Sequence, residues 1–133
     1  MKESILDIKS FEFAVKIVRL YQFLCEDKKE FVLSKQLLRA GTSITANINE
    51  SQYAESRIDF SHKLKISQKE CNETKFWLKL LMATDYISEK QFIEYEQERK
   101  HIMNMLSKSI LTIKKKQNDI NKNKDNNSNE KAT

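Results

Sequence analysis

The sequence has no proline and a single glycine, Gly41, among its 133 residues. Hairpin turns and bulges are normally built with glycine, proline or Asn-Gly pairs, so their scarcity argues against a β-sheet fold. Leucine, isoleucine, lysine and glutamate are abundant instead, and three of these four are strong helix formers. The length fits one domain with a hydrophobic core of its own. We therefore expect a single all-α domain.

Cysteines and long hydrophobic runs are also scarce. Cys25 and Cys71 are the only cysteines and have no C-x-x-C spacing, which indicates reduced thiols rather than a disulfide framework. No stretch approaches the roughly 18 uncharged apolar residues of a membrane span, and the N-terminus lacks the apolar region of a signal peptide. We expect a cytoplasmic protein without a membrane partner.

Residue patterns for catalysis or metal binding are few. His62 and His101 are the only histidines, and Glu98 with His101 makes one Glu-x-x-His element. A di-iron bundle requires a second copy of that element, which the sequence lacks. One glycine cannot build a phosphate-binding loop, and Cys71 falls on a predicted core line. We predict no catalytic residues, no metal site and no cofactor, and hence a protein that is not an enzyme.

Apolar residues recur with helical spacing in four segments. Ser10, Ser56 and Ser88 are plausible N-caps, and Ser88 with Gln91 fits a capping box. Short connections between amphipathic helices predict an antiparallel up-down-up-down four-helix bundle over residues 1–116. The segment 117–133 is polar and of low complexity, so we expect a disordered tail there. The expected helices cover about 10–26, 34–54, 57–84 and 89–116.

The first helix is apolar over an arc too wide for packing against one core. Such a helix is covered on two sides, which indicates an oligomer. The candidate residues for the subunit contact are Phe13, Leu20 and Phe23.

Polar residues run along one edge of the second helix. Arg39, Ser43, Asn47 and Glu50 lie beside its apolar line, and Glu73 and Glu70 on the third helix are candidate partners for Arg39. Half-buried polar groups need partners. The interpretation we favour is a structural seam of hydrogen bonds between helices. A role in a subunit interface is the alternative, and no nucleophile–base pair supports catalysis.

The net charge of +5 is unevenly distributed. Basic residues exceed acidic ones in the third and fourth helices, whereas the rest of the chain is nearly balanced. Stripes of lysine neutralise phosphates without reading sequence, so nucleic acid is a candidate partner. The alternative is that the lysines only keep the surface soluble. The candidate nucleic-acid-binding residues are Lys65, Lys69, Lys79, Lys100, Lys108, Lys114, Lys115 and Lys116.

Three segments carry a resemblance to a known family: LLRAGTSITANINES (37–51), ISQKECNETKFWLKLL (66–81) and Tyr86-Ile87-Ser88. They resemble the four-helix bundle proteins encoded in 23S rRNA intervening sequences. The accessory proteins of diversity-generating retroelements form a related branch. The sequence departs from the family pattern at Leu38, Thr45 and Ser51, where the family has arginine, proline and glycine.

The resemblance implies a bundle that assembles as a homopentamer, a role in binding RNA or DNA, and no established enzymatic activity. A second hypothesis follows from the related branch: an adaptor that binds a reverse transcriptase. The third is a structural oligomer without a nucleic-acid role.

Overall fold

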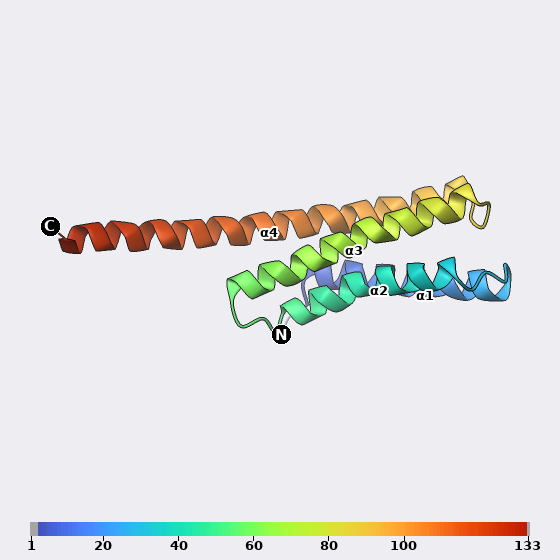
Figure 1. The fold of residues 1–133 in the computed structure, drawn as a ribbon, viewed down its shortest axis with the longest axis horizontal. Helices are drawn as coiled ribbons and strands as arrows, with labels where there is room; N and C mark the ends of the chain where they lie inside the picture. Colours follow the sequence, from blue (N-terminus) through green and yellow to red (C-terminus); the bar gives the residue numbers. More distant parts are fainter. Residues whose placement is uncertain (1–2, 133) are drawn as a thin grey trace.

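The protein is described by a computed structural model that covers residues 3–132, with side chains to residue 129. It contains four α-helices: α1 (Ile5–Glu26), α2 (Leu33–Ser51), α3 (Arg57–Ala83) and α4 (Glu89–Ala132). Consecutive helices run in opposite directions, and the described residues contain no strand (Figure 1). The expected all-α, up-down-up-down bundle is confirmed.

The helix starts follow capping chemistry. Ser56 and Ser88 cap α3 and α4 as predicted: each hydroxyl accepts a hydrogen bond from the backbone N–H three residues on. The first helix begins earlier than expected, because Ser4 forms a capping box with Asp7. Ser10 is instead buried in the helix, where its hydroxyl donates to Thr45 Oγ1 at 3.0 Å.

The start of α2 is capped from outside the helix. Val32 at the N-cap makes no side-chain hydrogen bond. Instead the carboxylate of Glu30 accepts the backbone N–H groups of Leu33 at 2.8 Å, Ser34 at 2.6 Å and Val32 at 3.0 Å. Burial acts to raise the pKa of Glu30, but these N–H donors outweigh it, and the net pKa is lowered. An acid at the positive end of a helix is further stabilised by the helix dipole.

Replacing Glu30 with glutamine will destabilise the protein by about 1–2 kcal/mol at neutral pH, since the amide accepts these hydrogen bonds less well. The folded-state pKa lies below the unfolded value, so this stabilisation is present above the unfolded pKa of about 4.3 and lost as the pH falls through the folded pKa. Urea unfolding of both proteins at neutral and acidic pH measures this. A difference that does not shrink on acidification would contradict the ionised cap.

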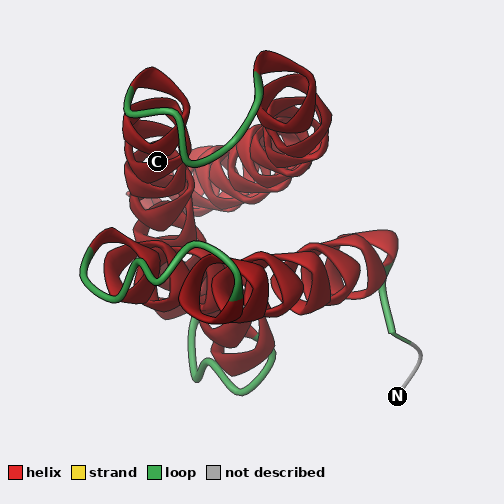
Figure 2. Cartoon of the chain, turned by 90° about the vertical axis from the view of Figure 1, so that its right-hand side faces the viewer, coloured by secondary structure: helices red, strands yellow, loops and turns green. Residues whose placement is uncertain are grey.

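Each helix packs against the next one in the chain, and the four surround one core. The largest contacts are α2 with α3 and α1 with α2, followed by α3 with α4, while α1 and α4 meet over a smaller area. Figure 2 views the bundle from the end that carries the α1–α2 and α3–α4 connections. Large side chains from all four helices are fully buried between them, among them Phe13, Ile17, Leu37, Ile44, Leu64, Leu78, Ile102 and Leu106.

Gly41 lies where α1 and α2 cross. A Cβ built on this residue would stand 2.8 Å from Cγ2 and 2.9 Å from Cγ1 of Ile17. Ile17 is completely buried, so the isoleucine has no room to retreat. The absence of a side chain at residue 41 therefore sets how closely the two helices approach.

The fourth helix is longer than the sequence predicts. Instead of ending near Lys116, α4 continues to Ala132 and projects beyond the bundle (Figure 1). No proline or glycine follows Gly41, and extending an existing helix adds a hydrogen bond for each residue without a new nucleation cost. As the composition predicts, the side chains of residues 117–129 are almost all exposed and add nothing to the core.

Candidate nucleic-acid interface

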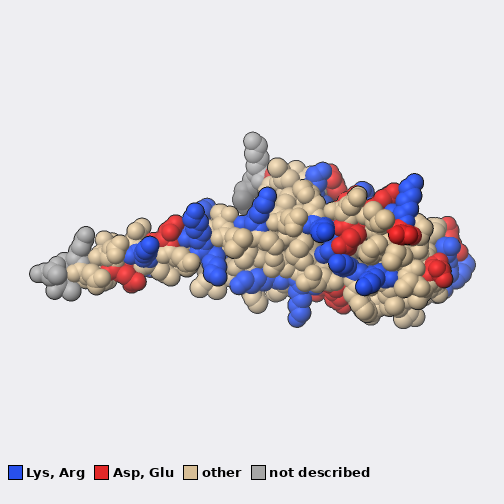
Figure 3. Space-filling model, turned by 90° about the horizontal axis from the view of Figure 1, so that it is seen from above, with Lys and Arg blue, Asp and Glu red and all other residues tan. Residues whose placement is uncertain are grey.

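Lysines from α3 and α4 share one outer face of the bundle. We call this surface the α3–α4 lysine face; every one of its lysines is exposed, and within residues 3–129 none takes part in an ion pair. Figure 3 looks down on this side, where blue basic atoms are spread over the surface with red acidic atoms between some of them. The face consists of Lys65, Lys69 and Lys79 on α3 with Lys100 and Lys114 on α4.

Polar contacts beneath this face hold the two helices together. Gln68 Nε2 on α3 donates to Ser107 Oγ on α4 at 3.0 Å. Near the other end, Lys75 Nζ lies 3.8 Å from Glu96 Oε1. These two contacts join α3 and α4 at different heights along the helices.

Arg99 is the most deeply buried cation of the described side chains, with 4% of its surface exposed. Its Nε and Nη2 donate to the two oxygens of Glu96 at 2.8 and 2.6 Å, and Nη1 donates to the carbonyl of Cys71 at 3.5 Å. Burial would raise the pKa of Glu96, but the hydrogen bond and charge of Arg99 lower it. The thiol of Cys71 is fully buried, and burial raises its pKa to about 12. It is a core group, as the sequence predicts.

The other three candidate lysines lie apart from the lysine face. Lys108 lines a cleft on the α1 side of α4, whereas Lys114 borders α3. On a helical wheel Lys115 and Lys116 point away from α3 as well. Of the eight predicted binding lysines, the structure brings five together.

Part of the predicted seam between α2 and α3 is present. Arg39 forms ion pairs with Glu73 and, at 3.4 Å, with Glu70. The hydrogen bond from Arg39 lowers the pKa of Glu73, whereas burial raises that of Glu70. Glu50 pairs with Lys63 on α3 at 3.0 Å. These contacts join α2 to α3.

Ser43 and Asn47 do not cross to another helix, in contrast to the prediction. Ser43 Oγ donates to the Arg39 carbonyl at 2.6 Å, and Asn47 Nδ2 donates to the Ser43 carbonyl at 2.8 Å, both within α2. The buried link that the sequence did not reveal is Ser67 Oγ on α3, which donates to the Ile44 carbonyl at 2.8 Å. The sequence signal for this contact was that Ser67 lies among the apolar core positions of its helix.

The predicted oligomer contact residues need correction. Phe13 and Leu20 are buried in the core of their own protomer, and Phe23 is only partly exposed. The apolar arc of α1 is wide because it faces both α2 and α4. The exposed apolar side chains of this helix are Ile5, Ile8, Phe11 and Val15.

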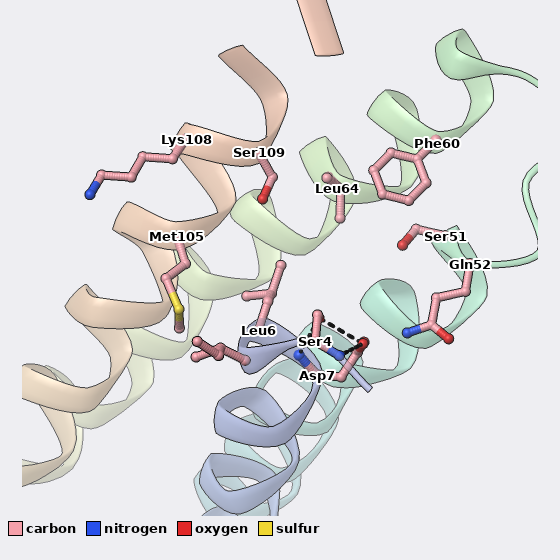
Figure 4. Close-up of a pocket in the computed structure, with 11 residues that line it drawn as sticks. Ser4, Leu6, Asp7, Ser51, Gln52, Phe60, Leu64, Met105, Lys108 and Ser109 are labelled. Atoms are coloured by element: carbon pink, nitrogen blue, oxygen red, sulfur yellow. Dashed lines mark hydrogen bonds between the residues drawn. The ribbon is translucent and has the colours of Figure 1, made fainter. Parts of the chain in front are cut away.

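A cleft of about 670 Å³ lies between the start of α1, the end of α2 and the facing turns of α3 and α4. In Figure 4, Leu6, Leu64 and Met105 converge there, while Lys108 extends away from them. Ser4 and Asp7 at its edge are engaged in the α1 cap. No histidine or cysteine is among its described lining residues.

Glu98 and His101, the one Glu-x-x-His element, border a smaller hollow of about 270 Å³ between α1 and α4. Glu98 pairs there with Lys16. Within the described chain no three acidic, histidine or cysteine side chains are close enough to hold a metal ion. None of the described helices is long and apolar enough to cross a bilayer.

This bundle is similar to known proteins in both sequence and structure. Residues 2–108 match the family model described as 23S rRNA-intervening sequence protein. The chain belongs to this family. A crystal structure of a protein of unknown function from Bacteroides thetaiotaomicron, assigned to the S23 ribosomal protein family, shares 50% identity and superposes with a TM-score of 0.79. The match covers 80% of this chain and 98% of that one, and no curated protein matches.

The 23S rRNA intervening sequence family pattern has proline and glycine where this chain has Thr45 and Ser51. Here α2 runs through Thr45 without interruption and ends at Ser51. Among the described residues only Lys29 and Asp85 have a positive φ, so the chain leaves α2 in a right-handed conformation.

Proposed function

We propose that this family member is a non-enzymatic homo-oligomer that binds RNA or DNA through the phosphate backbone. The observation that carries the proposal is the α3–α4 lysine face: five exposed ammonium groups on one side of two helices, without a carboxylate partner among the described side chains. Glu96 on α4 lies near this face, and its carboxylate is already paired with Arg99 and Lys75.

Lysine suits the phosphate backbone better than base edges. Its ammonium group is a point charge without the planar fork of arginine that reads guanine. Binding by such a face is therefore independent of sequence, and each phosphate contact releases condensed counterions. We expect the affinity to fall steeply as the salt concentration rises.

The oligomer part of the proposal rests on the outer side of α1. Ile8, Phe11 and Val15 are exposed on the face opposite the buried Ile17. A groove between α1 and α2 adjoins them, and the acidic Glu3, Asp7 and Glu12 line it beside Ile8 and Phe11. Covering this surface with a second copy would remove it from water, and the family resemblance implies five copies. Light scattering at micromolar concentration tests this: a monomer mass would refute it, and Phe11→Ser should weaken the assembly.

Charge reversal tests nucleic-acid binding. In the variant Lys65→Glu, Lys69→Glu, Lys100→Glu, we expect affinity for labelled RNA and for duplex DNA to fall at least about tenfold at low salt. The slope of log affinity against log salt should become shallower by about 2–3 units. Fluorescence anisotropy measures both quantities.

The matched control reverses three exposed basic residues that lie outside α3 and α4: Arg19→Glu, Lys28→Glu and Lys35→Glu. It changes the net charge equally, so it should retain most of the affinity. Equal losses in the two variants would mean that only total charge matters. Absence of binding by the unaltered protein at low salt would refute the proposal and leave the adaptor and structural hypotheses.

A further inference from the structure

A groove of about 470 Å³ lies between the first turns of α3 and the part of α4 that leaves the bundle. Arg57 and Lys65 line it from α3, and Lys114 lines it from α4; no acidic residue is among its described lining. None of the three cations forms an ion pair within residues 3–129. The groove therefore attracts an anion.

Apolar walls stand between these cations. Ile58 on α3 is 76% exposed and Leu111 on α4 is 64% exposed, and both line the groove. His62 adds an exposed imidazole ring on the α3 side. Large aliphatic side chains held open to water inside a cationic groove suit a ligand that is flat and apolar in one part and anionic in another.

The α4 wall of this groove lies outside the part of the chain that matches the family. Leu111, Lys114 and the amides of Gln117 and Asn118 follow residue 108, where the match to the family model ends. Because α4 continues as a helix past this point, it places these side chains opposite the start of α3. The matched residues thus supply only the α3 wall of the groove.

We infer that this groove binds an unpaired nucleotide of a single-stranded RNA or DNA segment, which rests on the proposed function and deepens it. The phosphate meets Arg57, Lys65 and Lys114. The base lies against Ile58, Leu111 and the His62 ring, because unstacked bases bind protein side chains through their faces. A duplex keeps its bases stacked inside and presents only phosphates, so the apolar walls contribute nothing to duplex binding.

The test removes the apolar walls and keeps every charge. The full-length variant Ile58→Ser, Leu111→Ser is compared with the unaltered protein by fluorescence anisotropy, using labelled oligouridine and a duplex RNA of equal length. We expect affinity for oligouridine to fall about tenfold, because one base face loses its apolar contact, and affinity for the duplex to change less than about twofold. The control Val32→Ser removes an exposed apolar group far from the groove and should change neither.

Equal losses for oligouridine and duplex, or no loss for either, would overturn the inference. Competition by a polyglutamate peptide as effective as that by unlabelled oligouridine would also overturn it and indicate an acidic protein partner. Failure of the proposed function is distinct: the unaltered protein would then bind neither RNA. If charge reversal weakens both ligands but the Ile58 and Leu111 variant does not discriminate, only the groove assignment fails.

Discussion

Replacing Arg99 with leucine is expected to lower the free energy of unfolding by about 3 kcal/mol, because it leaves the partly buried Glu96 carboxylate without its bidentate partner. Lys75 remains 3.8 Å from Glu96, too far to replace two short hydrogen bonds. Chemical denaturation monitored at Trp77, which lies on α3, measures the loss.

A double variant separates the loss of the ion pair from the loss of packing at Arg99. The double variant Arg99→Leu, Glu96→Leu removes both charges, and a well-packed apolar pair costs little or nothing relative to an ion pair. We expect it to recover most of the lost stability. A double variant as unstable as the single one would show that the guanidinium acts through packing alone.

The pH dependence follows from the lowered pKa of Glu96. Its contribution to stability is present above the unfolded value of about 4.3 and lost as the pH falls through the folded pKa. The deficit of Arg99→Leu relative to the unaltered protein should therefore shrink in acid, where Glu96 becomes neutral. A constant deficit would contradict this account.

Replacing Gly41 with leucine is expected to cost about 3 kcal/mol or more, since even its Cβ would stand 2.8 Å from the buried Ile17. Gly41→Ala is the milder variant, with an expected loss of about 1–2 kcal/mol. This loss runs against helix propensity, by which alanine is favoured by about 1 kcal/mol. Thermal and urea unfolding both measure the change.

Ala46 supplies the matched control, because it is an exposed residue of the same helix. There the substitution Ala46→Gly should destabilise by about 1 kcal/mol, as propensity alone dictates. The preference for glycine over alanine is thus expected to reverse between residues 41 and 46. If alanine stabilises at both positions, α1 and α2 have room to separate.

Local chemistry in the sequence predicted most of the bundle. The caps at Ser56 and Ser88 and the partners of Arg39 follow from residue type and helical spacing, which act over short distances. Ser10 was misread because a serine before an apolar run fits both a cap and a buried position. Only tertiary contact with Thr45 distinguishes them.

Which side of a helix faces solvent was harder to predict. The wide apolar arc of α1 could not reveal that Phe13 and Leu20 face the protomer's own core while Phe11 is exposed. The sequence could not show which five of the eight predicted lysines share one face. That depends on how α3 and α4 are aligned against each other. The length of α4 was not predicted, because its last part packs against no other helix and therefore has no apolar residues at helical spacing.

That unpacked part of α4 gives the molecule an elongated outline. It extends the helix by about 24 Å past Lys116, at 1.5 Å per residue. A protein of this form tumbles more slowly about its short axes and elutes from a sizing column ahead of a compact protein of 15.7 kDa. An apparent dimer in such a column is the expected behaviour of a single copy, so only mass measurements independent of shape report how many chains assemble.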